Sequence, residues 1–323
     1  MELQNNLRSS GTCLPVGASL HTAFVLTLRT QAARTRVYTR REFYGFNAHS
    51  INAFGVGAGW VSRNYFAGKV TPQDVLVKHT VFGFARLGLS SLDAERASCS
   101  LIEGRRLCGE LQANTQVHVP RAVLRWCPIC ADAESNELGF ASWHVLHQLP
   151  FMMMCPTHCT PLVTVDGLCQ CYDRDPIKLR LPGERCHTCH KIEPLELTVP
   201  AGKAYRRFVK LCAEAFHEQP STFIHENWTR FVLELVGCFG SEARAIDAIE
   251  KQLCKDWELP SAESIGSAWG WAISVPEVLG LVVKDRYNSS PTWKKIVVYD
   301  AMKKVLPCDI EVCCRPSSKK SAT

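Results

Sequence analysis

The 323-residue sequence lacks any uncharged apolar run of about 18 residues, the length that a membrane-spanning helix needs. Its opening residues, MELQNNLRSSGTCLPVG, contain no apolar core and no small-residue cleavage site, so we expect no secretory signal. We therefore expect a cytoplasmic protein with no membrane partner. In that compartment cysteine thiols stay reduced.

Several catalytic signatures are also missing. There is no Gly-x-x-x-x-Gly-Lys-Ser/Thr loop, so the chain is not itself a P-loop ATPase. No His-Glu-x-x-His motif occurs, and no His-x-Glu stands at a suitable distance before Cys127, as a zinc deaminase requires. The glycines of residues 55–59 lack dinucleotide-binding spacing and indicate a turn. We therefore expect a protein that is not an enzyme.

Cysteine, in contrast, is abundant. The 17 Cys are about 5% of the chain, below the level of a small disulfide scaffold but high for a cytosolic protein. Eight of them crowd into residues 127–189, and clustered reduced thiols are typical of metal ligands. These eight are Cys127, Cys130, Cys155, Cys159, Cys169, Cys171, Cys186 and Cys189.

The first predicted metal site combines two short motifs. Cys127-Pro-Ile-Cys130 directs two thiolates to one ion from a tight turn, and Cys155-Pro-Thr-His158 supplies a thiolate and an imidazole. Three thiolates and one imidazole form a tetrahedral zinc site. Because protein groups fill all four positions, we expect a structural zinc ion rather than a catalytic one.

A second structural zinc ion is predicted downstream. Cys186-His-Thr-Cys189 is a second two-residue pair, and Cys169-Gln-Cys171 is its partner despite a one-residue gap. His187 and His190 are substitutes if only one of Cys169 and Cys171 binds. A crossed arrangement, as in a RING, stays open. It would join Cys127, Cys130, Cys169 and Cys171, and leave Cys155, His158, Cys186 and Cys189 for the other ion.

The remaining cysteines and two histidines receive structural interpretations. We expect His144 and His147 at the surface or the edge of the core rather than on a metal. Cys159 is interpreted as a small core residue because a ligand next to His158 is sterically awkward. We expect Cys212, Cys238 and Cys254 to act as small hydrophobic residues on the apolar faces of helices.

Charge divides the chain into three units. Residues 1–126 carry a net charge of +8, residues 127–199 carry −4 and residues 200–323 carry +2. We predict a basic helical domain at 1–125, a tandem zinc module at 126–199, a helical domain at 200–306 and a loose tail at 307–323. A candidate nucleic-acid contact lies in the first domain, although a solvated face is the alternative; its residues are Arg34, Arg36, Arg40 and Arg41.

Apolar spacing predicts a mainly α fold with short strands in the zinc module. Thr71 and Ser91 are expected to cap helices, with Pro72 in the first helical position. Residues 139–149 are expected to contain a short helix and residues 151–154 a strand. The other predicted helices span residues 18–29, 202–218, 228–239, 241–253, 275–281 and 291–306.

The order of these motifs resembles the TniQ family. The resemblance rests on Trp126-Cys127-Pro-Ile-Cys130, on Phe140-Ala-Ser-Trp143-His-Val-Leu-His-Gln-Leu-Pro150 and on Cys155-Pro-Thr-His158-Cys-Thr-Pro-Leu162. Softer matches are Leu14-Pro-Val-Gly-Ala-Ser19-Leu20 with Arg29, His79-Thr80-Val-Phe-Gly-Phe, and Pro291-Thr-Trp-Lys-Lys-Ile-Val-Val-Tyr299. The chain departs from the family with Cys159 in place of a common Gly, and with Cys169-Gln-Cys171 in place of a Cys-x-x-Cys pair.

The resemblance implies a target-selection factor of DNA transposition with helix-turn-helix elements beside zinc-ribbon-like modules. Such a protein contacts attachment-site DNA or an RNA-guided CRISPR effector, and it recruits an AAA+ transposition regulator. It is bacterial and associates with the nucleoid during transposition; self-association stays open. Two other interpretations remain: a zinc-stabilised transcription regulator, and an enzyme such as a RING ligase or a zinc hydrolase.

Overall fold

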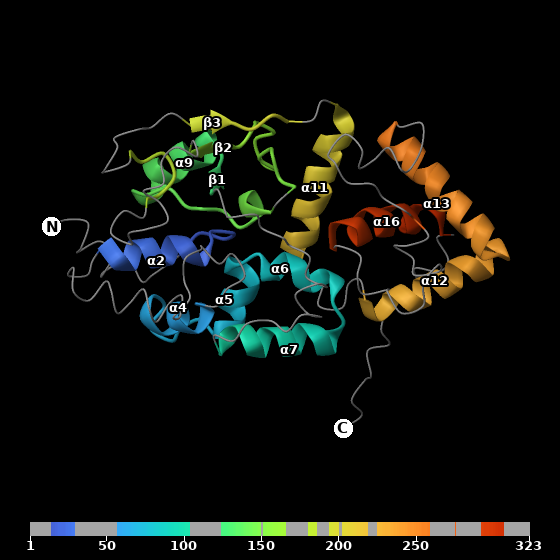
Figure 1. Cartoon of the computed structure of the whole chain (residues 1–323), viewed down its shortest axis with the longest axis horizontal. Helices are drawn as coiled ribbons and strands as arrows, with labels where there is room; N and C mark the ends of the chain where they lie inside the picture. The colour runs from blue at the N-terminus through green and yellow to red at the C-terminus, as the bar shows by residue number, and fades with distance from the viewer. Residues whose placement is uncertain are drawn as a thin grey trace, which may run out of the picture.

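A computed structural model describes residues 14–29, 57–103, 124–149, 151–165, 180–185, 194–199, 202–218, 225–258, 275 and 292–306. Within these ranges the fold is mainly helical, with ten α-helices and one small antiparallel sheet (Figure 1). No helix of the described residues is both long and apolar enough to cross a membrane. The predicted mainly α class is therefore confirmed, while the helix-turn-helix and tandem zinc-ribbon assignments stay predictions.

The N-terminal helices lie together along one side of the molecule (Figure 1). Thr71 caps one of them as predicted, since its hydroxyl accepts a 3.0 Å hydrogen bond from the Asp74 amide. The helix expected to begin at Ser91 is capped by Ser90 instead. The backbone of Ser90 is extended, so its hydroxyl accepts a 3.0 Å hydrogen bond from the Asp93 amide. The elements are α2 (Leu20–Arg29), α4 (Ala58–Asn64), α5 (Pro72–His79), α6 (Phe82–Ala85), η1 (Arg86–Gly88) and α7 (Ser91–Ile102).

The central unit contains the sheet, in which β2 (Val163–Val165) pairs with both β1 (Arg125–Trp126) and β3 (Pro194–Glu196). Its helix α9 (Pro128–Leu138) precedes the stretch in which a helix was expected, and η2 (Leu146–Gln148) is all that forms there. Gly139 ends α9 with φ of +78°, a left-handed conformation that glycine adopts without strain. The strand expected at residues 151–154 is reduced to an isolated bridge between Met154 and Pro161.

The C-terminal helices match their predicted positions to within a few residues. They are α11 (Lys203–Glu218), α12 (His225–Phe239), α13 (Glu242–Trp257) and α16 (Thr292–Val305). Ser241 caps α13 by accepting a hydrogen bond from the Arg244 amide. Of the helix expected at 275–281, only Val275 lies within the described residues, and the tail at 307–323 lies outside them.

Two hydrophobic cores flank the central unit. One joins the N-terminal helices to Trp126 and Trp143, whose rings pack edge to face with their centroids 5.7 Å apart. The other joins Phe151 to Phe208 of α11 and Trp293 of α16. Because both cores include side chains of the central unit, burial of apolar surface holds it against helices on either side. The predicted domain boundaries stay predictions.

The segment around Trp143 attaches the central unit to the start of α2. Ala18 and His144 form an isolated antiparallel bridge, and the Trp143 amide donates to the Thr22 hydroxyl at 2.9 Å. His79 Nδ1 lies 2.6 Å from the Ala18 carbonyl oxygen, so this nitrogen carries the hydrogen and donates it. Three segments that carry the family resemblance, around Ala18, His79 and Trp143, thus meet at one junction.

Candidate metal centre

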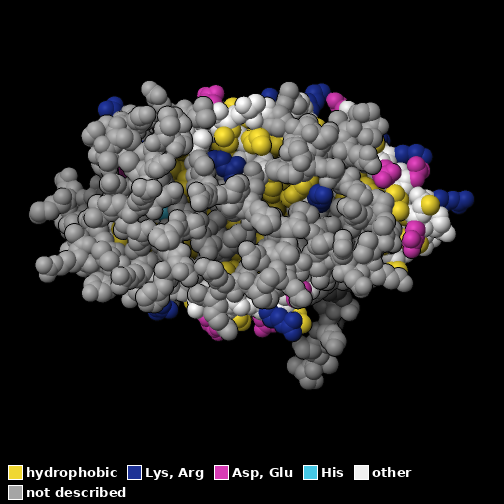
Figure 2. Space-filling view, in the orientation of Figure 1, with side chains coloured by type: hydrophobic (Ala, Val, Ile, Leu, Met, Phe, Trp, Pro, Cys, Tyr) yellow, Lys and Arg dark blue, Asp and Glu magenta, His cyan; other side chains and the backbone are white. Residues whose placement is uncertain are grey.

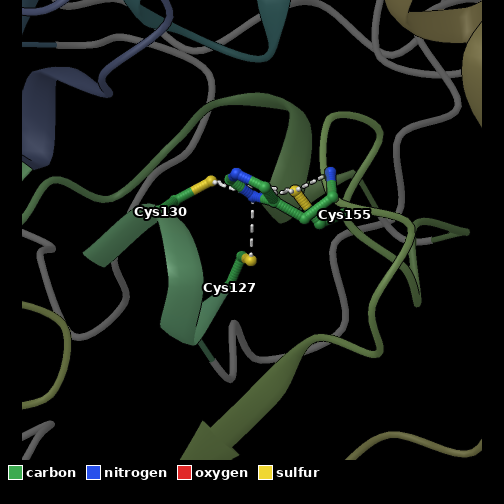
Figure 3. Close-up of side chains that lie close together, drawn as sticks. Cys127, Cys130 and Cys155 are labelled. Carbon is green, nitrogen blue, oxygen red and sulfur yellow. Dashed lines mark hydrogen bonds between the residues drawn. The ribbon is translucent and has the colours of Figure 1, made fainter. Parts of the chain in front are cut away.

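Two turns bring the predicted ligands of the first site together (Figure 3). Cys127 is the N-cap residue of α9 and Cys130 lies in its first turn, with Pro128 in the first helical position. The other turn is closed by a 2.9 Å hydrogen bond from the Cys159 amide to the Cys155 carbonyl. It places Cys155 and His158 opposite the start of α9.

The spacing of the four side chains matches a tetrahedral zinc ion. Bonds of about 2.3 Å to sulfur and 2.0 Å to nitrogen put two sulfurs about 3.8 Å apart, and a sulfur and a nitrogen about 3.5 Å apart. The Sγ atoms of Cys130 and Cys155 are 3.7 Å apart. His158 Nδ1 lies 3.5 Å from Sγ of Cys127, 3.3 Å from that of Cys130 and 3.6 Å from that of Cys155.

The four ligand atoms all lie within 4.8 Å of one another, and Nδ1 is the histidine atom that faces the thiols. A group of this kind occurs once among the described residues. Cys127 and Cys155 are buried, and Cys130 and His158 are half-buried. Four protein donors leave no position for a substrate, so the geometry fits a structural metal ion.

The electrostatics of the thiols also favour a cation. Hydrogen bonds from Cys130 and Cys155 lower the pKa of Cys127, whereas hydrogen bonding with Cys127 raises the pKa of Cys130 and Cys155. Three thiols at this separation cannot all ionise beside one another. A divalent cation removes the conflict because it stabilises each thiolate at once.

Polar contacts outside the ligands orient this site. The Thr160 hydroxyl lies 3.4 Å from the Cys127 sulfur, and the His158 amide lies 3.5 Å from the Cys155 sulfur. Contacts of this kind fix the direction of a ligand and tune its basicity. The sequence gives no signal for Thr160, because its role depends on the folded turn.

A second set of contacts holds the chain that connects the two turns. Arg125 donates to the carbonyls of Met152 at 2.8 Å and Leu149 at 2.7 Å. From α11, the Tyr205 hydroxyl donates to the Phe151 carbonyl at 2.8 Å and accepts from the Met153 amide at 2.7 Å. Sequence reasoning missed Arg125 and Tyr205, since these bonds join positions far apart in the chain.

The two histidines of the connecting chain are not part of the ligand group. His147 is buried, and burial lowers its pKa to about 3, so it is neutral. His144 is half-buried, and its Nε2 lies 2.9 Å from Glu134 Oε1 on α9. The expected place at the surface or the edge of the core therefore fits half-buried His144 but is wrong for His147, which lies inside the core.

The interpretation of Cys159 as a core residue is wrong. Its side chain is exposed and its φ is +54°, in the left-handed region that residues with a Cβ seldom adopt. This conformation is a physical reason for glycine at the same position in the TniQ pattern. Cys238 is likewise exposed rather than packed, while Cys212 is buried as expected and Cys254 is intermediate.

The remaining predicted site residues lie outside the described part of the chain. These are the second metal site, Cys169, Cys171, Cys186 and Cys189, and the basic cluster, Arg34, Arg36, Arg40 and Arg41. The crossed arrangement would place Cys127 and Cys130 on a different ion from Cys155 and His158. The grouping of these four around one point favours the sequential arrangement.

Comparison with known proteins gives one family match. The TniQ family model matches residues 20–162, a span that begins with α2 and includes all four residues of the metal centre. No curated protein matches the chain.

Proposed function

We propose that the chain selects the target site in DNA transposition, because its residues 20–162 match the TniQ family model. The family assignment supports a transposition-associated function. The proposal goes further: the chain is an adaptor that contacts nucleic acid and recruits an AAA+ transposition regulator. The observation that carries it is the Cys127, Cys130, Cys155 and His158 group inside the matched domain.

In this proposal the metal centre is a scaffold. When bound, zinc supplies folding free energy by cross-linking the two turns. Arg125 and Tyr205 then fix the connecting chain, and Trp143 attaches the unit to α2. As a scaffold, the metal centre takes no part in a chemical reaction, and the proposed adaptor is not an enzyme.

The nucleic acid is either attachment-site DNA or the nucleic acid of an RNA-guided CRISPR effector. A net charge of +8 over residues 1–126 favours contact with phosphates, because cations that neutralise them release counterions. The acidic residues 127–199, with a net charge of −4, are better suited to a protein partner.

The experiment that tests the proposal is affinity purification of the tagged chain from its native host, combined with DNA footprinting. We expect an AAA+ ATPase to co-purify, and transposon insertion to lose its target preference when the gene is deleted. A CRISPR effector in the same fraction would identify an RNA-guided target. Operator-specific repression with no ATPase and no effect on insertion would instead support a zinc-stabilised transcription regulator.

A further inference from the structure

The helix α11 has one strongly polar face and one buried face. Lys203, Arg206 and Lys210 are exposed and spaced three and four residues apart, so they lie on one side of the helix. At a rise of about 1.5 Å per residue they span roughly 10 Å. We name these three residues the α11 basic face.

Little within the described structure neutralises the α11 basic face. Lys203 and Arg206 have no carboxylate within ion-pair distance among the residues that the structure describes. Lys210 reaches Glu214 at 3.7 Å, with side chains 75% and 51% exposed. An exposed pair of this kind contributes little, so Lys210 can exchange Glu214 for another anion. Arg207, in contrast, is bound to Asp256 and Asp300 and is left out of the face.

The opposite side of α11 is firmly anchored. Tyr205 bonds to the backbone beside the metal centre, and Phe208 packs against Phe151 and Trp293. Figure 1 shows α11 between the central unit and the C-terminal helices. The α11 basic face is therefore presented from a rigid position, which lowers the entropy lost when a partner binds.

We propose that the α11 basic face contacts the phosphate backbone of duplex DNA. This inference rests on the proposed function, to which it adds a specific surface outside the matched domain. Three cations lie along one side of the helix, and Glu214 is the next residue on that side. A basic stripe of this kind is the electrostatic footprint of a nucleic-acid-binding surface. The contact is independent of base sequence because phosphates carry no sequence information.

The helix α13 provides an internal comparison. Its exposed cations Arg244, Lys251 and Lys255 alternate with the acids Glu242 and Asp247, and Lys251 lies 2.7 Å from Asp247. Figure 2 shows side chains of both signs interspersed at the end of the molecule formed by α12 and α13. A mixed surface of this kind has no net attraction for a polyanion, so α13 is not expected to bind DNA.

The test is a titration of a labelled mixed-sequence duplex of about 30 base pairs with the zinc-loaded full chain. Binding is measured by fluorescence anisotropy at several salt concentrations. The triple variant K203Q/R206Q/K210Q is compared with R244Q/K251Q/K255Q, which removes the same number of positive charges from α13. For the first variant we expect the affinity at about 0.1 M salt to fall on the order of 100-fold, and the slope of log K against log salt to flatten by about 2 to 3.

The α13 variant should bind as the wild type does, and Glu214→Gln should bind more tightly because it removes the acid beside Lys210. An equal loss of affinity in both triple variants would overturn the inference, since it would show that binding depends on the net charge of the chain and not on the α11 basic face. Unchanged binding by K203Q/R206Q/K210Q would overturn it and leave the nucleic-acid function intact. A wild-type chain that binds no duplex would overturn both this surface and direct DNA contact in the proposed function.

Discussion

Glu134 of α9 holds the backbone amide of Ser142, the residue before Trp143, whose own amide bonds to Thr22 of α2. Its Oε2 accepts a 2.6 Å hydrogen bond from the Ser142 amide, and its Oε1 lies 2.9 Å from His144 Nε2. Glu134 lies one helical turn beyond Cys130 on α9, a helix in which Ala131 alone is buried. Because α9 has so little apolar packing, the metal ligands and Glu134 hold it in place.

Glu134→Ala is expected to destabilise the chain by about 1–3 kcal/mol, because the Ser142 amide then loses its acceptor. Asp132→Ala, on the exposed side of the same helix, should stay within about 0.5 kcal/mol of the wild type. Denaturant unfolding of the zinc-loaded chain measures both values. Equal stability of the two variants would show that Glu134 does not hold α9.

Gly83→Ala is expected to be strongly destabilising. A Cβ at this position would lie 1.9 Å from the Val77 carbonyl oxygen, a contact that requires the backbone to shift. Overpacking of this kind costs about 1–3 kcal/mol or more. The control is Gly237→Ala in α12, where nothing lies within 4 Å and alanine should stabilise the helix by about 0.5–1 kcal/mol. Thermal unfolding that ranks the two variants in the reverse order would contradict the packing of α6 against α5.

Acid should destabilise the fold through His21. Burial lowers the pKa of this residue from 6.5 to about 3, so the folded state keeps it neutral while the unfolded state takes up a proton below pH 6.5. The free energy of unfolding therefore keeps its full value above pH 6.5. It falls as the pH drops toward 3, by up to about 1.4 kcal/mol per pH unit. Unfolding free energies of wild type and His21→Gln between pH 7 and 5 measure this slope. Zinc release affects both proteins, so a slope that does not become shallower in His21→Gln would refute the assignment to His21.

The local parts of this structure could be predicted from sequence. The spacing of Cys127, Cys130, Cys155 and His158 sufficed because a two-residue gap in a tight turn can place both ends on one ion. The cap at Thr71 and most helices followed from equally local signals. The sequence did not predict α9, since a helix with one buried residue has no apolar periodicity to detect. It also missed α4, which begins at Ala58 inside the glycine-rich stretch that was interpreted as a turn.

The non-local parts could not be predicted in the same way. Glu134 bonding to Ser142, and Tyr205 bonding to Phe151, join elements whose relative position only the folded cores determine. The conformation of Cys159 is a similar case. Its positive φ follows from closing the turn around His158, and a cysteine at that position gives no warning of it.

The most direct test of the metal centre is the zinc-to-protein ratio of the wild type and of Cys155→Ser. We predict two zinc ions for the wild type, one of them held by the group described above. Cys155→Ser should lose that ion and the cooperative unfolding of the central unit, because structural metal binding is folding free energy. An unchanged ratio and an unchanged melting curve would contradict the assignment of Cys127, Cys130, Cys155 and His158 to one structural zinc ion.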